Sequence, residues 1–329
     1  MADLALVFRS WRGAPDAEEM ARVSNAANRA EGVEEHNTAE GLLNSFGHPD
    51  EHADAARDVV IVEHDGDVVA YGWHNWVDTT DGLREHRLGG FVHPEWTHRG
   101  IGRRLLLWLE ERARESADEH STDRPQIYGT WADEERAGKR ALLEHQGYTE
   151  ARWFFEMRRD GLESVDVPPM PDGLEVRPIS TDRHSLRQLF DADAEAFQDH
   201  WGGFNSNDAM FEEWLHEPDQ DPSLYVVAWD GDEIAGAVLN LIVRADNAAF
   251  GIRRGWLVSV FVRRPWRRRG LAAALVARSL VVLREQGMDS AMLGVDADNP
   301  TSALGVYERA GFVVAKRASA YRKPMALGS

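Results

Sequence analysis

Five arginines stand within the seven residues 263–269, directly before a glycine, Gly270. They are Arg263, Arg264, Arg267, Arg268 and Arg269. A guanidinium group binds phosphate oxygens through two parallel hydrogen bonds, so such a cluster is suited to a polyphosphate. The whole chain carries a net charge of −19, which makes a basic cluster conspicuous. The alternative interpretation is a basic loop that is simply solvated.

The residues on either side of the cluster predict the elements that position it. Residues 257–262 are apolar and rich in valine, which predicts a strand. After Gly270 the apolar side chains follow helical spacing, at Ala272, Leu275, Val276, Leu280 and Leu283. A strand, a glycine-containing turn and a helix direct free backbone N–H groups and the positive end of the helix dipole toward one point. That point favours an anion, phosphate above all.

Composition limits the class of protein. The 329 residues are 43% hydrophobic and 28% charged, which is typical of a globular chain with room for two domains. No apolar run approaches the roughly 20 residues of a membrane helix, and residues 1–13 lack the pattern of a signal peptide. We therefore expect a cytoplasmic protein with no membrane partner. The acidic net charge argues against a nucleic-acid partner.

Two residue types bear on metal and redox chemistry. The chain contains no cysteine, which excludes disulfides and thiolate nucleophiles. Its 13 histidines form no metal-binding motif such as H-E-x-x-H. We expect no metal site.

One pattern of elements occurs twice along the chain. Asp65-Gly66 and Asp230-Gly231 each stand between two apolar runs, which predicts two hairpins. A turn containing Trp96 is repeated 170 residues later around Trp266, each time before an amphipathic helix. Both halves then continue with a strand, a short helix, a Gly-aromatic pair and a last strand. An internal duplication explains this order.

The boundary between the copies falls in residues 161–173, which contain three prolines and show no periodicity. The predicted domains are residues 1–164 and residues 173–329. Each begins with a strand and two helices, the helices at about 17–30 and 38–45 in the first copy and 184–197 and 208–216 in the second. The predicted fold class is α/β, an α+β mixed sheet with helices on both faces.

The second half resembles the GNAT (GCN5-related) N-acetyltransferases. The pyrophosphate signature of that family, Arg/Gln-x-x-Gly-x-Gly/Ala, is matched by residues 267–272. A second family segment, N-x-x-x-A-x-x-x-Y-x-x-x-G-F, is matched in order and spacing by Asn299, Ala303, Tyr307 and Gly311-Phe312. The resemblance covers nearly all of residues 174–327. With the duplication it implies two tandem GNAT-like acyl-CoA N-acyltransferase domains.

The resemblance implies where acetyl-CoA binds. In the family the strand before the turn pairs with the pantetheine arm, which carries over to Val260, Phe261 and Val262. The turn binds the pyrophosphate, which carries over to the backbone of Arg267, Arg268, Arg269, Gly270, Leu271 and Ala272. Asn299 either contacts the cosubstrate or only caps the helix that follows it.

The resemblance also implies the chemical step, in which an amine attacks the thioester directly. A backbone N–H at Val260 or Phe261 is the candidate to stabilise the charge that develops on the carbonyl oxygen. Tyr307 is the candidate catalytic acid that protonates the leaving thiolate. The alternative role of Tyr307 is core packing, because it has apolar spacing with Ala303 and Leu304.

The general base is not identified by any motif. The candidates are Asp296, Asp199 and His200, and a structural or surface role is the alternative for the histidine. Three aromatic residues either line an apolar acceptor pocket or belong to the core: Trp201, Phe204 and Trp214.

The first half resembles the family less closely. Thr97 replaces the first residue of the pyrophosphate signature, and Leu143 stands where the second half has Tyr307. Glu135 occupies the position of Asn299. We expect a degenerate, non-catalytic and mainly structural domain, and residues 99–102 leave CoA binding there open.

These observations predict an N-acetyltransferase that transfers an acetyl group from acetyl-CoA to a small-molecule amine, with its active site in the C-terminal domain. The expected state is a monomer or homodimer without metal. The alternative is a catalytically silent acyl-CoA-binding or scaffold protein.

Overall fold

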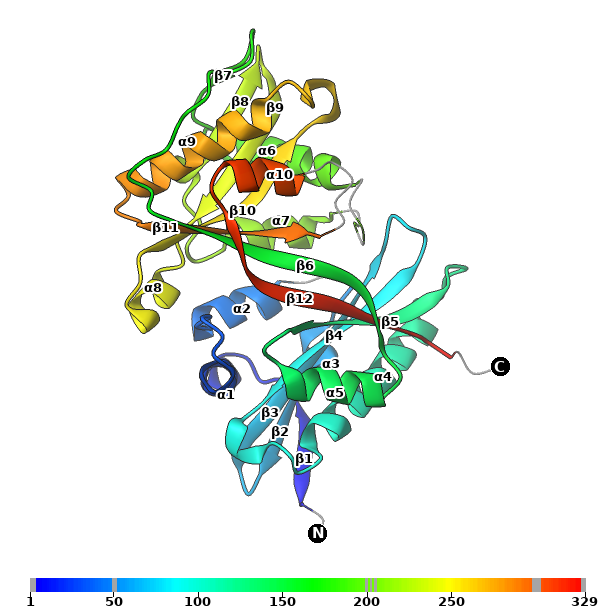
Figure 1. The fold of residues 1–329 in the computed structure, drawn as a ribbon. Helices are drawn as coiled ribbons and strands as arrows, with labels where there is room; N and C mark the ends of the chain where they lie inside the picture. The colour runs from blue at the N-terminus through cyan, green and yellow to red at the C-terminus, as the bar shows by residue number, and fades with distance from the viewer. Residues whose placement is uncertain are drawn as a thin grey trace. The chain divides into compact units, whose positions relative to one another are not determined.

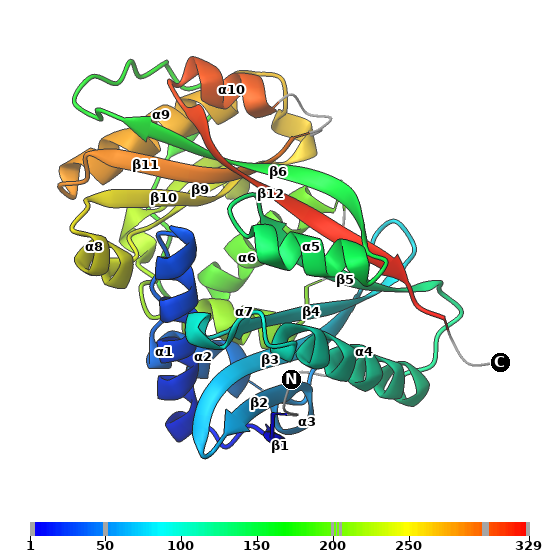
Figure 2. The ribbon, with the colours of Figure 1, turned by 60° about the horizontal axis from the view of Figure 1, so that its bottom comes forward.

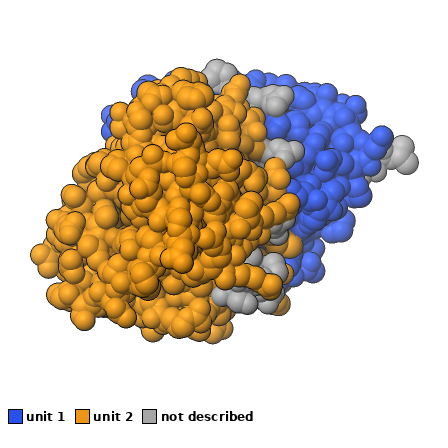
Figure 3. All heavy atoms as spheres, turned by 90° about the horizontal axis from the view of Figure 1, so that it is seen from above, with its two compact units in different colours: residues 1–151, 319–329 blue, residues 152–318 orange. Residues whose placement is uncertain are grey.

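The computed structural model of the protein describes residues 4–48, 52–198, 201, 203, 206–297 and 303–326. The chain forms two compact units (Figure 3). Unit 1 consists of residues 1–151 and 319–329, and unit 2 consists of residues 152–318.

The first half of the chain contains the elements β1 to β6 and α1 to α5 (Figure 1). Its strands are β1 (Leu6–Ser10), β2 (Val59–His64), β3 (Asp67–Asp78), β4 (Arg84–Val92), β5 (Gln126–Asp133) and β6 (Thr149–Asp160). Its helices are α1 (Ala14–Glu31), α2 (Ala39–Gly47), α3 (Ala55–Asp58), α4 (Ile101–Glu119) and α5 (Ala137–His145), with a 3-10 turn η1 (Pro94–Trp96).

The second half repeats this order with two differences: the 3-10 turn η2 stands where the first half has α3, and a helix, α8, is added between its central strands. Its strands are β7 (Glu175–Val176), β8 (Val226–Asp230), β9 (Glu233–Leu241), β10 (Arg254–Val262), β11 (Ser290–Asp296) and β12 (Val313–Pro324). Its helices are α6 (Arg183–Phe197), α7 (Asp208–Leu215), α8 (Arg244–Phe250), α9 (Leu271–Glu285) and α10 (Ala303–Arg309), with 3-10 turns η2 (Pro222–Leu224) and η3 (Arg264–Trp266).

Each unit is a mixed sheet with helices on both faces (Figure 2). In unit 1 the strand order is β1-β2-β3-β4-β5-β12, and only β4 and β5 among β1 to β5 are parallel neighbours. One core cluster lies under α1 and α2, and another lies under α4 and α5. The predicted fold class is confirmed.

Unit 2 has the order β6-β11-β10-β9-β8-β7, with β10 and β11 parallel. Its core cluster under α9 and α10 includes Leu275 and Tyr307, and its cluster under α6 and α7 includes Leu189 and Phe211. Both D-G hairpins and all four early helices are confirmed, because short-range turn and periodicity signals determine them. The short helix α8 was not predicted.

The compact units differ from the sequence boundaries at residues 164 and 173. Strands β6 and β12, the last strands of the two halves, are each twelve residues long. Residues 152–160 of β6 belong to unit 2, and residues 319–324 of β12 belong to unit 1. Each unit therefore includes part of the last strand of the other half. The linker, residues 161–173, lies wholly within unit 2.

Across the described parts of the chain, every helix is too short or too polar to cross a lipid bilayer.

Candidate active site

The sheet of unit 2 opens between its two parallel strands. The ladder between β10 and β11 ends at the pair Leu257 and Leu293, although both strands continue. Beyond that pair, β10 stays bonded to β9 and β11 stays bonded to β6. Residues 258–262 therefore present a strand edge toward β11 that can bond an extended ligand as an added strand would.

A β-bulge lies where the two strands separate. The ladder between β10 and β9 shifts register between Leu257 and Ser259. Leu257 packs in the core under α9, whereas Phe261 packs in the core under α6. In an unbroken strand these two residues would share a face, so the bulge has reversed the alternation. It turns Ser259 toward α6.

The turn after β10 has the backbone of an anion site. Arg268 adopts a left-handed conformation with φ of 63°, and Gly270 has φ of 85° at the N-cap of α9. No side chain caps the helix, and its first backbone bond joins the N–H of Ala274 to the carbonyl of Gly270. The N–H groups at the start of α9 therefore have no acceptor within the helix.

The arginine cluster divides into structural and exposed members. Arg267 donates to the carbonyls of Val262, at 2.9 Å, and Ala196, at 3.2 Å, which ties the turn to β10 and α6. Arg263 forms an ion pair with Glu195 at 2.8 Å. The side chains of Arg268 and Arg269 are exposed, and Arg269 gives one N–H to the carbonyl of Asp172 at 2.8 Å. The expectation of a five-arginine clamp needs correction, because two of the five guanidinium groups hold the turn in place.

Tyr307 lies on α10 in the core under α9, with 6% of its surface exposed. Its ring meets Phe312 edge to face at 6.2 Å. Burial raises the pKa of the phenol to about 12, so the hydroxyl is protonated at neutral pH. Among the described residues the hydroxyl has no hydrogen-bond partner. Asn299 lies outside the described residues.

Asp296 is a poor candidate for a proton acceptor. It is buried at the end of β11, and both of its carboxylate oxygens accept hydrogen bonds from Arg152, at 2.8 and 3.0 Å. Both of its carboxylate oxygens are therefore already engaged by a guanidinium. The other base candidates, Asp199 and His200, lie outside the described residues, as does Phe204.

The two remaining aromatic candidates differ in their surroundings. Trp214 stacks on Phe211 and Tyr225 in the core under α6 and α7, which favours the packing interpretation. Trp201 is partly exposed and lies 6.1 Å from the ring of Phe154. Trp201 thus keeps its place as a candidate for the acceptor pocket.

The structure adds a carboxylate that the sequence analysis did not single out. Asp193 of α6 accepts a hydrogen bond from the hydroxyl of Ser259 at the bulge. Its side chain is partly exposed, and desolvation raises its pKa to about 6 although the hydroxyl lowers it. The sequence held one signal for it: Asp193 follows Leu186 and Leu189 on the apolar stripe of α6, where a charge is unexpected.

Unit 1 keeps the turn but not the bulge. His98 and Gly100 have φ values of 59° and 81°, which repeat the conformations of Arg268 and Gly270. The ladder between β3 and β4 runs without a register shift. The indole of Trp73 covers Gly89, the counterpart of Ser259, so closely that a Cβ there would lie 2.1 Å from the ring.

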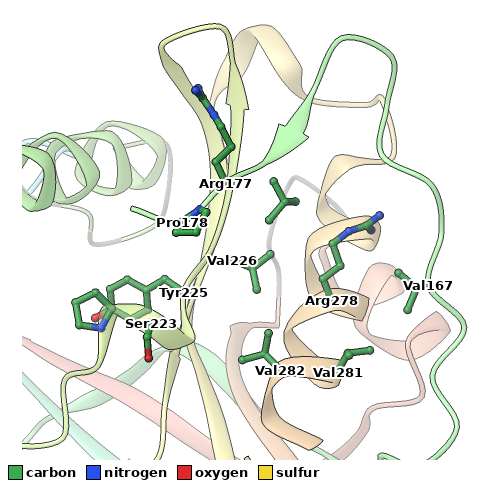
Figure 4. Close-up of a pocket in the computed structure, with 11 residues that line it drawn as sticks. Val167, Arg177, Pro178, Ser223, Tyr225, Val226, Arg278, Val281 and Val282 are labelled. Carbon is green, nitrogen blue, oxygen red and sulfur yellow. The ribbon is translucent and has the colours of Figure 1, made fainter. Parts of the chain in front are cut away.

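A separate pocket of about 350 Å³ lies in unit 2 beside α9 (Figure 4). Its wall is mostly apolar and includes Val226 and Val282. Arg278, at its edge, already donates to the carbonyls of Pro168 and Ala274, both at 2.9 Å. None of the residues at the bulge or the turn lines this pocket. In the described residues, no group of three or more His, Asp or Glu side chains is arranged to hold a metal ion.

Comparison with known proteins identifies the class that this fold and site define. Residues 185–312 match the acetyltransferase (GNAT) family, and residues 55–150 match a GNAT acetyltransferase domain. The chain belongs to the GNAT acetyltransferase family and carries two GNAT domains in tandem, as the sequence predicted.

Several relatives of this chain are mycothiol acetyltransferases. The protein of that name from Geodermatophilus obscurus is 31% identical over 78% of this chain and 79% of its own length. The one from Thermobispora bispora is 28% identical over 90% and 92%. This agrees with a layout similar to mycothiol synthase, which the duplicated sequence also suggests.

Solved structures show the same arrangement of elements. A GCN5-related N-acetyltransferase from Sphaerobacter thermophilus is 27% identical, with a TM-score of 0.71 over 98% of this chain and 97% of that one. A tandem GNAT protein from the clavulanic acid biosynthesis pathway has a TM-score of 0.68 at 18% identity, over 98% and 100%, and shows the fold alone.

Proposed function

We propose that this acetyltransferase transfers an acetyl group from acetyl-CoA to the amine of a small molecule, by direct attack in unit 2. The observation that carries the proposal is the opening of the β10–β11 ladder directly before the uncapped turn of α9. An extended arm bonded to the free edge of β10 would have its diphosphate end at the N-terminus of α9. A thioester with a phosphate-bearing tail needs this combination.

The proposed contacts with acetyl-CoA follow the strand and the turn. Val260, Phe261 and Val262 offer backbone groups to the pantetheine arm, and a backbone N–H at Val260 or Phe261 offers a donor for the oxyanion. The backbone of residues 267–272 offers donors for the diphosphate. The exposed guanidinium groups of Arg268 and Arg269 add positive charge there.

Tyr307 is the proposed acid for the leaving thiolate. Its burial keeps the phenol protonated, which a proton donor requires. Among the described residues nothing bonds its hydroxyl, which leaves the proton available.

Unit 1 is proposed to be catalytically silent. Its β4 lacks the bulge, and Trp73 covers the strand where unit 2 has Ser259. Leu143 is buried in the core at the position of Tyr307 and offers no proton.

The relatives direct the choice of acceptor. Because they carry the name mycothiol acetyltransferase, deacetylated mycothiol is the first amine to test. The test is release of CoA thiol from acetyl-CoA with that compound and a panel of small amines, with mass spectrometry of the product. Amine-dependent thiol release with an acetylated product is expected. Binding of acetyl-CoA without turnover of any amine would instead support the silent binding protein.

A further inference from the structure

Tyr307 and Asp193 lie on opposite faces of the sheet of unit 2, in which the β10–β11 ladder ends at Leu257. Tyr307 belongs to the core cluster under α9, which also contains Leu275. Asp193 stands on α6, and α6 packs on the other face with Phe261. A thioester bonded to the edge of β10 would lie between these two residues.

The two faces differ in what they offer an incoming amine. On the α9 face, Val260 and Val262 pack against a continuous apolar core. On the α6 face, the bulge presents the hydroxyl of Ser259, and the carboxylate behind it is partly exposed. A polar nucleophile therefore approaches the carbonyl from the α6 side, because the α9 side would strip it of water among apolar side chains and already holds the proton donor Tyr307.

We infer that Asp193 is the general base of the reaction, held in position by Ser259 at the bulge of β10. The inference rests on the proposed function. The amine nitrogen attacks the acetyl carbon, and the nitrogen becomes positively charged as the N–C bond forms. Asp193 accepts one proton from this nitrogen, the C–S bond breaks, and the sulfur accepts a proton from Tyr307. The products are an acetamide and the CoA thiol, and both side chains return to their starting states through solvent.

The charges around Asp193 are compatible with this role. The neighbouring acids on α6 are paired elsewhere, Asp191 with Arg187 at 2.8 Å and Glu195 with Arg263 at 2.8 Å. Arg187 also pairs with Asp208 of α7 at 2.6 Å. No charged group among the described residues shifts the pKa of Asp193, which desolvation raises and Ser259 lowers. With a pKa of about 6 the carboxylate is ionised at neutral pH yet binds a proton better than an exposed aspartate does.

The experiment compares kcat/KM from pH 5 to 9 in wild type, Asp193→Asn and Ser259→Ala, with acetyl-CoA and an amine that the wild type acetylates. Protonation of the amine itself affects all three proteins equally. Dividing kcat/KM of one protein by that of another at each pH therefore leaves only the effect of the changed side chain. Asp193→Asn is expected to lose about 10²- to 10⁴-fold in rate at pH 8. The wild-type-to-variant ratio should fall as the pH drops through about 6, because the wild type then loses its ionised carboxylate. The ratio of Ser259→Ala to Asp193→Asn should show the same inflection at a higher pH. The hydrogen bond from Ser259 stabilises the ionised carboxylate, so its loss raises the pKa of Asp193.

Asp191→Asn is the matched control. It removes a carboxylate two residues away on the exposed side of the same helix and should leave rate and profile unchanged. Binding of acetyl-CoA, measured by calorimetry, shows whether each variant is folded.

The outcomes separate the two hypotheses. If Asp193 were purely structural, the ratio of kcat/KM between the wild type and Asp193→Asn would not change with pH. That result would overturn the inference. If Asp193→Asn did not fold, an unmoved inflection in Ser259→Ala would overturn it as well. A wild type that binds acetyl-CoA but acetylates no amine would contradict the proposed function, and the inference would fall with it.

Discussion

At the scale of single residues, Tyr307 is the side chain whose role is most sharply testable. Tyr307→Phe removes one hydroxyl from a buried ring and leaves its edge contact with Phe312 in place. We expect kcat to fall by about 10²-fold, the usual range for general acid catalysis. The KM for acetyl-CoA should change little, because the proton is needed in the transition state rather than for binding.

Steady-state kinetics of both proteins makes this measurement. Wild-type activity should show no alkaline loss from Tyr307 below about pH 10, because burial raises the pKa of the phenol to about 12. An unchanged kcat in the Phe variant would make Tyr307 a packing residue.

A second residue-scale feature lies in unit 1, where buried side chains form a hydrogen-bonded chain. His86 contacts Gln126 at 2.8 Å and His74 at 3.0 Å. His74 contacts Asp58 at 3.2 Å, and Arg112 donates to the same carboxylate at 2.7 Å. Burial lowers the pKa of His86 to about 4, so the folded protein favours its neutral form.

The pH dependence of stability follows from this shift. Unfolding returns the pKa of His86 from about 4 to the ordinary histidine value of about 6.5, so the unfolded chain binds more protons between these pH values. The stabilisation that comes from keeping His86 neutral is therefore fully present above pH 6.5 and is lost as the pH drops toward 4. From pH 7 to pH 5 the shifted pKa of His86 lowers the free energy of unfolding by about 2 kcal/mol.

Urea unfolding at pH 7 and pH 5 tests this expectation. In His86→Gln the free energy of unfolding should differ much less between pH 7 and pH 5 than in the wild type, whatever its value at pH 7. His145→Gln, at an exposed position, should keep it. Equal pH dependence in the wild type and His86→Gln would show that another group is responsible.

At the scale of elements, the two strand-turn-helix segments provide a matched pair of variants. Gly270 and Gly100 have φ of 85° and 81°, and in both cases a Cβ would meet nothing within 4 Å. Valine at either position is strained by its backbone conformation rather than by a clash, at a similar cost of about 1–3 kcal/mol. Equal strain isolates the functional difference between the turns.

We expect Gly270→Val to weaken acetyl-CoA binding by about tenfold or more, because a relaxed turn no longer directs its N–H groups at the diphosphate. Gly100→Val should keep most of its turnover, since unit 1 is proposed to be silent. Titration calorimetry and thiol release measure the two effects. Equal losses of activity in the two variants would place a working site in unit 1 as well.

At the scale of the whole molecule, the last strand of the chain completes unit 1. Lys323 of β12 pairs with Glu110 at 2.8 Å, and Arg322 pairs with Glu85 at 2.8 Å. The backbone N–H of Met325 bonds the carbonyl of Gln126 at 3.0 Å. Residues 1–164 alone therefore lack part of their own unit.

This composition predicts the behaviour of a chain cut in its linker. Cleavage at a protease site inserted between residues 168 and 172 should give two fragments that elute together in size-exclusion chromatography. Each unit contains residues from both fragments, because β12 contributes to unit 1 and β6 contributes to unit 2. They should separate only at urea concentrations that also unfold the uncut chain. Separation without denaturant would contradict the exchange of strands.

The sequence by itself determined the features that arise within short stretches of chain. The hairpins at Asp65-Gly66 and Asp230-Gly231, the amphipathic helices and the turn at residues 267–272 follow from local conformational preferences and periodicity. Repetition of these local signals was enough to predict two tandem domains. The strand, turn and helix around Gly270 were predictable for the same reason.

Only the tertiary structure decided which distant groups share an environment. Asp193 and Ser259 are 66 residues apart, and the pKa of Asp193 depends on burial that neither residue determines alone. Arg267 holds the turn because the carbonyl of Ala196, 71 residues earlier, lies within reach. The strands with which β6 and β12 pair likewise depend on sheet edges formed by other parts of the chain. Burial, charge pairing and strand partnership are properties of neighbours in space, and local sequence patterns do not specify them.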